Sequence, residues 1–129
     1  MNSMKYDLLY LAAGALLGAF LRYKITGDNL FAGTLPISVL LINIVGSFIL
    51  GMSSTAVSSL GLDERYTLFV GIGFCGTLTT MSSFALETVN LITVGKLATA
   101  FVNVILNVSG SLGAILLGRA VISLILGLV

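Results

Sequence analysis

The chain has 129 residues, of which 57% are apolar and only 9% are charged, and its mean hydropathy is +1.14. A soluble domain has about 25% charged residues, so this composition excludes water as the main solvent. The formal net charge of +1, without a long basic run, argues against a nucleic-acid partner. A single cysteine and no histidine argue against an internal disulfide, a typical zinc site and most enzyme active sites.

Four apolar segments follow one another along the chain, with approximate bounds 6–24, 36–57, 66–94 and 97–127. Crossing the bilayer takes about 20 mostly apolar residues per helix, so each segment is long enough to span it. We therefore predict an all-α integral membrane protein, with one four-helix domain over residues 1–129. It would be a multi-pass protein of the plasma (inner) membrane, in contact with the lipid bilayer and not an enzyme. The first segment lacks a signal cleavage site and is expected to be retained.

The first two spans carry packing and boundary signals. Gly14 and Gly18 lie four residues apart, a small-xxx-small pattern that lets two helix backbones approach closely. Pro36 suits the first turn of the second span. We expect the first span to be a packing helix.

The six basic residues are divided equally between the two ends of the four predicted spans. Lysine and arginine near span ends favour the cytoplasm. One end would carry Lys5, Arg65 and Arg119, and the other Arg22, Lys24 and Lys96. A three-to-three balance predicts that the chain inserts in both orientations.

Polar residues recur inside the second and fourth spans. Asn43 shares a helical face with Ser47, and Asn103, Asn107 and Ser111 recur every four residues in one stripe. Amides and hydroxyls of this kind join helices by hydrogen bonds, or they supply uncharged donors that replace water around a small anion without trapping it. The pattern alone leaves both readings open.

The third span is the most informative. Between Gly71 and Thr80, three glycines precede three threonines, which favours a break in the helix near residues 76–80. Non-helical backbone at membrane depth survives where it is buried or lines a cavity, and its carbonyls can coordinate a cation. The alternative is an intact helix whose hydroxyls bond back to the preceding turn. Glu87, two turns later, is a candidate proton carrier, cation partner or surface residue.

At these residues the chain resembles a known family. The run GFCGTLTTMSSFALE, from Gly73 to Glu87, is similar to the signature of the Fluc/CrcB family of fluoride channels. The runs GALLGAFLRY, LLINIVGSFILG and NVILNVSGSLGAILLG follow the family's order and spacing, so the resemblance covers nearly the whole chain. It implies an antiparallel (inverted) homodimer with two pores, passive and fluoride-selective export, and resistance to fluoride.

The resemblance also implies site residues. A structural Na⁺ at the dimer centre would be held by the backbone carbonyls of Gly76 and Thr79 of each chain. Arg22 would lie in a vestibule, and Glu87 matches an acidic residue with a possible gating or ion-coupled role. The pore or fluoride-binding residues would be Asn43, Thr80, Met81, Ser83, Phe84, Asn107 and Ser111. The family places two phenylalanines in its pores, and here Met81 replaces the first.

Other hypotheses stay open at this stage. A proton-coupled exporter of cationic compounds, similar to the small multidrug resistance transporters, needs a carboxylate within its first span, where this chain has only Asp7. A non-transporting assembly subunit would use the polar stripe to bind partner helices. A heterodimer with a paralogous chain of opposite orientation is a further alternative to the homodimer.

Overall fold

The computed structural model describes residues 2–27, 31–32 and 34–128. Long helices dominate it. In chain order the elements are α1 (Asn2–Gly27), β1 (Phe31–Ala32), β2 (Leu35–Pro36), α2 (Ser38–Leu60), the π-helix η1 (Thr67–Cys75), α3 (Gly76–Leu78), α4 (Met81–Thr93) and α5 (Leu97–Ile125).

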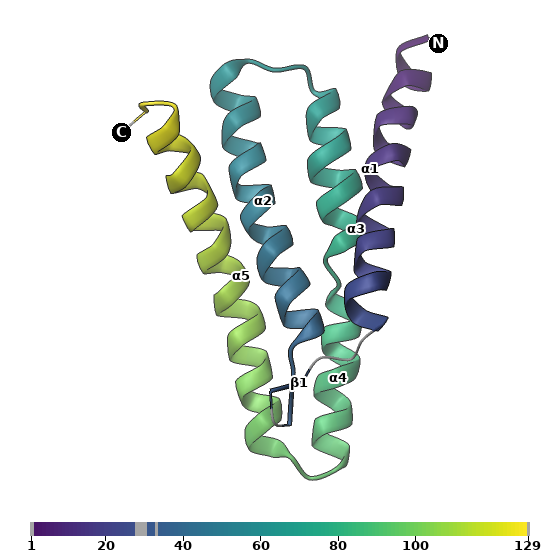
Figure 1. Cartoon of the computed structure of the whole chain (residues 1–129), viewed down its shortest axis with the longest axis vertical. Helices are drawn as coiled ribbons and strands as arrows, with labels where there is room; N and C mark the ends of the chain where they lie inside the picture. The colour runs from purple at the N-terminus through teal and green to yellow at the C-terminus, as the bar shows by residue number, and fades with distance from the viewer. Residues whose placement is uncertain (1, 28–30, 33, 129) are drawn as a thin grey trace.

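The four apolar helices expected from the sequence are present. The helical segments that are long and apolar enough to cross a membrane are Met4–Gly27, Ser38–Leu60, Thr67–Thr93 and Leu97–Ile125. Their ends differ from the predicted bounds by at most three residues. The third of them is built from η1, α3 and α4 in succession. Both termini lie at the same end of the molecule, as an even number of crossings requires (Figure 1).

The second span begins two residues later than predicted. Pro36 is not in the first turn of α2 but in β2, where it is the partner of Phe31 in a two-residue antiparallel hairpin. Helix α2 then starts at Ser38. Proline at a helix start and proline at a strand edge use the same property, the missing N–H, so the sequence alone did not separate them.

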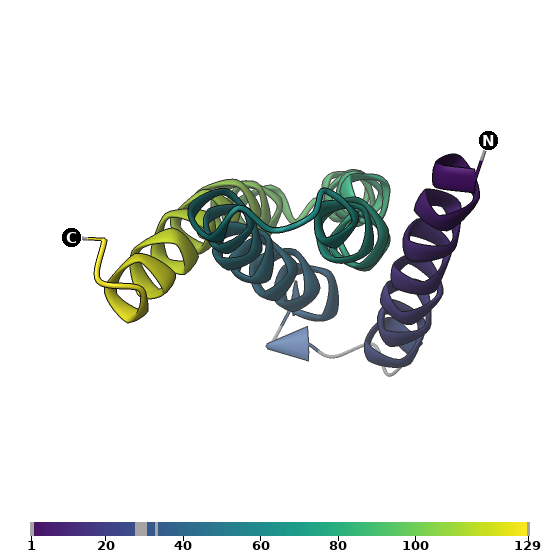
Figure 2. The same ribbon diagram turned by 90° about the horizontal axis from the view of Figure 1, so that it is seen from above.

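Seen from above, the helices form a row rather than a closed bundle, with α1 and α5 at its two ends (Figure 2). Helix α1 packs on η1 through the two glycines singled out in the sequence. A Cβ atom on Gly14 would overlap the Phe69 carbonyl, and one on Gly18 would overlap the Phe74 carbonyl and the Thr77 hydroxyl. The predicted close approach of α1 is therefore present, and its partner is the third span.

Helices α2 and α5 pack by the same device. A Cβ on Gly51 of α2 would overlap the Ile115 carbonyl, and one on Gly118 of α5 would overlap the Phe48 carbonyl. The two helices run in the same direction, side by side along most of their length (Figure 1). Glycines thus set the backbone separation in both of the main helix pairs.

The interior of a single chain is small. Ile42, Cys75 and Leu78 are almost completely buried, whereas large apolar side chains such as Leu16 and Phe101 are 72% and 67% exposed. Apolar surface of this extent is satisfied by lipid or by another apolar protein surface. Most of the outward surface thus suits the bilayer.

Candidate functional site

The third span changes conformation at two residues. Helix α3 ends at Leu78, Thr79 and Thr80 are extended (φ −76°, ψ 154° and φ −151°, ψ 112°), and α4 begins at Met81. The predicted interval 76–80 is therefore only partly non-helical, because Gly76 to Leu78 remain in a short helical turn. In the description below, the break means Thr79 and Thr80.

Side chains replace the lost helical hydrogen bonds at the break. In a continuous helix the Thr80 N–H would donate to the Gly76 carbonyl, but here it donates to Asn43 Oδ1 at 2.8 Å. The Thr80 hydroxyl caps α4 by accepting from the Ser83 N–H at 3.2 Å. The break is thus held both by the next helix and by α2.

Asn43 joins three elements. Its Nδ2 donates to Asn107 Oδ1 of α5 at 3.0 Å and, at 3.4 Å, to the Thr80 carbonyl. Asn43 and Asn107 are 9% and 4% exposed. The polar positions predicted on α2, α5 and the third span are therefore in direct contact.

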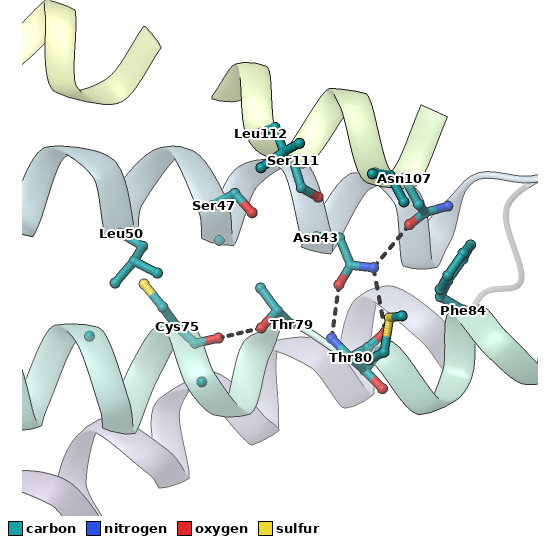
Figure 3. Close-up of a pocket in the computed structure, with 15 residues that line it drawn as sticks. Asn43, Ser47, Leu50, Cys75, Thr79, Thr80, Phe84, Asn107, Ser111 and Leu112 are labelled. Atoms are coloured by element: carbon teal, nitrogen blue, oxygen red, sulfur yellow. Dashed lines mark hydrogen bonds between the residues drawn. The ribbon is translucent and has the colours of Figure 1, made fainter. Parts of the chain in front are cut away.

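A cavity of about 390 Å³ lies against this cluster, between α2, α5 and the third span (Figure 3). Its lining residues are Asn43, Gly46, Ser47, Leu50, Gly71, Cys75, Gly76, Thr79, Thr80, Met81, Phe84, Asn107, Val108, Ser111 and Leu112. None of these described lining residues is charged. The cavity offers uncharged amides and hydroxyls beside apolar carbon.

Most of the predicted pore residues line this cavity: Asn43, Thr80, Met81, Phe84, Asn107 and Ser111. Gly76 and Thr79, predicted for the cation, line it as well. Phe84 is buried at 7% exposed, whereas Met81 is 73% exposed on the rim of the single chain. Met81 and Phe84, the positions that match the two pore phenylalanines of the family, thus differ in exposure.

Three predicted residues do not line the cavity. Ser83 belongs to the cap of α4. Arg22, from the end of α1, donates from Nη1 to the Thr79 carbonyl at 3.3 Å. Glu87 has a buried Oε2 that has no hydrogen-bond partner among the described residues.

Seven lining residues were not among the predicted site residues, and two of them, Ser47 and Cys75, carry polar or reactive side chains. Ser47 shares the helical face of Asn43, so the four-residue spacing was the signal that pointed to it. Cys75 was considered only as a redox or metal residue, yet it is 1% exposed and packs against the cavity as a small apolar side chain.

The most polar connection, between α2 and η1, lies away from this cavity. Arg65 Nε forms an ion pair with Asp7 Oδ1 at 3.2 Å, and both side chains are about one-third exposed. The hydrogen bond to Asp7 raises the pKa of the Arg65 guanidinium above its ordinary value. Asp7, the only carboxylate of the first span, is thus engaged at the end of α1 rather than in the interior.

Four membrane-length helices, with a cavity between three of them whose wall carries uncharged amides and hydroxyls, define a multi-pass membrane protein with an uncharged polar site. The family model of the CrcB-like protein, Camphor Resistance (CrcB), matches residues 9–119. This chain belongs to the CrcB-like family and is a multi-pass protein of the plasma membrane.

Three relatives illustrate the similarity. The fluoride-specific ion channel FluC of Nitrosopumilus maritimus (strain SCM1) is 48% identical over 120 residues, which cover 93% of this chain and 95% of that protein. The protein of the same name from Methanocaldococcus jannaschii is 40% identical and covers 88% of this chain and 91% of its own length. The one from Acinetobacter baumannii (strain AYE) is 38% identical, with 91% and 94% covered. These relatives carry the name of an ion channel and not of an enzyme.

Proposed function

We propose that this chain forms a fluoride-selective channel through which fluoride leaves the cytoplasm passively. The observation that carries the proposal is the cavity at the break, where Asn43, Thr80, Asn107 and Ser111 gather uncharged donors between apolar helices. The names of the relatives support fluoride as the ion, because identity to them extends over most of the chain.

The chemistry of the lining suits a small anion in transit. Amide N–H and hydroxyl groups replace the water that fluoride sheds, and the absence of a charged group among the described lining residues avoids trapping it. The ring edge of Phe84 carries weak positive charge and adds a further favourable contact. Fluoride is the smallest halide, so a pathway narrow enough to need direct contact with these groups would accept it more readily than larger halides.

Met81 stands where the family has a phenylalanine. A thioether is polarisable but lacks the positive ring edge, so the anion path of this chain relies on Phe84, Asn43 and the hydroxyls. Since Met81 lies on the exposed rim of the single chain, it would meet the ion near the mouth of the cavity.

The channel is proposed to be an inverted homodimer with a pore in each half and the break near the bilayer midplane. Lys5 and Arg65 lie near the end of the molecule that holds the termini, and Arg119 lies in the last two turns of α5, toward that same end. Arg22, Lys24 and Lys96 lie toward the opposite end, so the positive-inside rule gives neither orientation an advantage.

A structural Na⁺ at the dimer centre is part of this proposal. Uncharged carbonyl oxygens are ligands that hard cations accept, and the redirected Thr80 N–H leaves the Gly76 carbonyl without its usual helical donor. Two carbonyls from each inverted chain, those of Gly76 and Thr79, would make a four-oxygen site. Arg22 already donates to the Thr79 carbonyl, so the cation would use the second lone pair of that oxygen.

Passive export needs no energy source. When the medium is acidic, hydrogen fluoride diffuses inward and ionises in the more alkaline cytoplasm, which accumulates the anion. A fluoride channel lets that anion leave down its electrochemical gradient and so confers resistance to fluoride.

The test is ion efflux from liposomes that contain only this purified chain, with a potassium ionophore to carry the counter-charge. We expect the parent chain to release fluoride rapidly and to release no chloride. The Asn43→Ala variant should release fluoride at least about tenfold more slowly. Asn90→Ala is the matched control, because Asn90 is an exposed asparagine of α4 outside the cavity.

Release of neither ion from folded, dimeric protein would overturn the homodimeric channel. Equal release of fluoride and chloride would overturn the proposed selectivity. Because no second gene product is present, a positive result also excludes any need for a paralogous partner.

A further inference from the structure

A line of side-chain hydrogen bonds extends from Asn43 away from the cavity. Asn43 Nδ2 donates to Asn107 Oδ1 at 3.0 Å, and Asn107 Nδ2 donates to Asn103 Oδ1 at 3.0 Å. Asn103 Nδ2 donates to Thr88 Oγ1 at 3.1 Å. We call the four side chains of Asn43, Asn107, Asn103 and Thr88 the amide relay.

The amide relay has one direction from beginning to end. At its start Asn43 Oδ1 accepts from the Thr80 N–H at 2.8 Å, and at its end the Thr88 hydroxyl donates to the Phe84 carbonyl at 2.8 Å. Turning Asn43 or Asn107 over would place N–H against N–H and oxygen against oxygen, and turning Asn103 over would place its N–H against that of Asn107. The orientations of the three amides are therefore consistent with one another, and backbone groups of the third span fix both ends, at the Thr80 N–H and at the Phe84 carbonyl. Within the amide relay, Asn107 Nδ2 donates to the Asn103 backbone carbonyl at 3.1 Å as well as to its side chain.

Asn103 acts at a distance from any ion in the cavity. It is 0% exposed and is not among the residues that line the cavity, whereas Asn43 and Asn107 are. Nothing in the path proposed above uses Asn103 or Thr88. Within the described residues, their side-chain hydrogen bonds join only other members of the amide relay and the backbone of α4 and α5.

The Thr80 N–H and the amide relay together fix which group Asn43 presents to the cavity. One Nδ2 hydrogen is held by Asn107 Oδ1 at 3.0 Å, and the other is shared with the Thr80 carbonyl over a long 3.4 Å. A bond of that length is weak and easily exchanged for an anion. With the amide reversed, its carbonyl oxygen would take that place, and an oxygen with partial negative charge repels an anion.

We propose that Asn103, together with Thr88, is a positioning residue for anion passage. Through Asn107 it holds the Asn43 amide with an N–H, not a carbonyl oxygen, directed toward the passing ion. This inference rests on the proposed anion channel, and it adds two residues that never touch the ion.

The test compares two threonines of α4 that share the same local chemistry. Thr88 donates to the Phe84 carbonyl and Thr93 to the Val89 carbonyl, at 2.8 Å and 2.9 Å, but only Thr88 accepts from Asn103. Thr88→Val removes the acceptor for Asn103 and keeps the shape of the side chain. Thr93→Val removes an equivalent hydroxyl outside the amide relay.

The readout is the fluoride concentration that gives half-maximal flux in liposomes, measured together with the melting temperature. We expect Thr88→Val and Asn103→Leu to raise that concentration about tenfold, while Thr88→Ser and Thr93→Val stay within about twofold of the parent chain. Thr88→Val leaves the buried Asn103 Nδ2 without its acceptor, so its melting temperature should fall somewhat below that of Thr93→Val. The half-maximal concentration is therefore compared at a temperature at which every variant is folded, which separates positioning from a general loss of stability.

The outcomes separate the two proposals. A parent chain that conducts fluoride, with Thr88→Val unchanged in half-saturation, would overturn the positioning role and leave the channel intact. If the parent chain itself passes no fluoride, the channel fails and the positioning role fails with it. If Asn103→Leu does not fold, the comparison of the three threonine variants still tests the positioning role.

Discussion

Asn43 and Thr80 show how single residues build the site. The amide of Asn43 accepts from the Thr80 N–H and donates weakly to the Thr80 carbonyl, so it takes the place of a neighbouring peptide group. The Thr80 hydroxyl meanwhile begins α4 by accepting from the Ser83 N–H. A broken helix inside an apolar span is better tolerated because the Thr80 N–H, the Thr80 carbonyl and the Thr79 carbonyl each have a side-chain partner.

Substitutions at Phe84 and at Met81 should change the rate of fluoride efflux by different amounts. We expect Phe84→Leu to slow fluoride efflux about tenfold, because it removes the only aromatic ring edge among the described residues of the cavity wall while keeping its bulk. Met81→Leu, also a cavity-lining change, should alter efflux by less than about threefold, since no ring edge is lost there. Initial rates from the fluoride electrode measure both.

The reverse order would contradict this account. If Met81→Leu slowed efflux more than Phe84→Leu did, the exposed Met81 side chain and not the buried Phe84 ring would control the rate of fluoride efflux. Met81→Phe, which restores the family's residue, provides a third comparison on the same assay.

At the scale of the helices, glycine contacts matter more for stability than the polar bonds. Interhelical side-chain hydrogen bonds in membrane proteins contribute on average about 0.6 kcal/mol each. An overpacked helix contact costs about 1–3 kcal/mol. The α1–η1 and α2–α5 pairs, where glycines let the backbones touch, are therefore where small changes should be felt most.

Gly18→Ala tests that contact with the smallest possible change. The added Cβ would overlap the Phe74 carbonyl and the Thr77 hydroxyl, so α1 must move away from the third span. We expect a fall of several degrees in the melting temperature of the purified protein. Gly113→Ala of α5 is the control, because nothing lies within 4 Å of its Cβ position and alanine favours the helix.

Equal melting temperatures for the two variants would show that the α1–η1 contact does not limit stability. A more stable Gly18→Ala would show that helix propensity outweighs packing at this position.

The elements differ in how far the sequence could predict them. Hydropathy and span length predicted four long helices, since crossing a bilayer restricts both. The start of α2 was misplaced because Pro36 fits a helix start and a strand edge equally well. The π-helical turns of η1 were not predicted, because hydropathy and residue spacing do not distinguish a π-helix from an α-helix.

For the whole molecule, the sequence predicted which polar positions share a helical face but not how the faces meet. Spacing placed Asn43 on one face of α2 and Asn107 with Ser111 in one stripe of α5, and the structure brings the three residues to one cavity. The contact of Arg22 with the Thr79 carbonyl and the direction of the amide relay depend on the register between separate helices. That register arises from side-chain packing across the molecule, which a single sequence does not encode in its local pattern.

The central claim is that the ion crosses through this cavity, and two serines of α5 test it most directly. Ser111 lines the cavity, whereas Ser109 is exposed on another face of the same helix and donates to the Ile105 carbonyl. Each would be changed to cysteine in a Cys75→Ala background, so that one thiol is present. Both variants would be labelled with a small neutral methanethiosulfonate reagent, with labelling verified by mass.

We predict that labelling slows fluoride efflux about tenfold or more for Ser111→Cys and changes it by less than about twofold for Ser109→Cys. Efflux that is equally fast in the two labelled variants would contradict the account, because fluoride would then cross the protein somewhere other than this cavity.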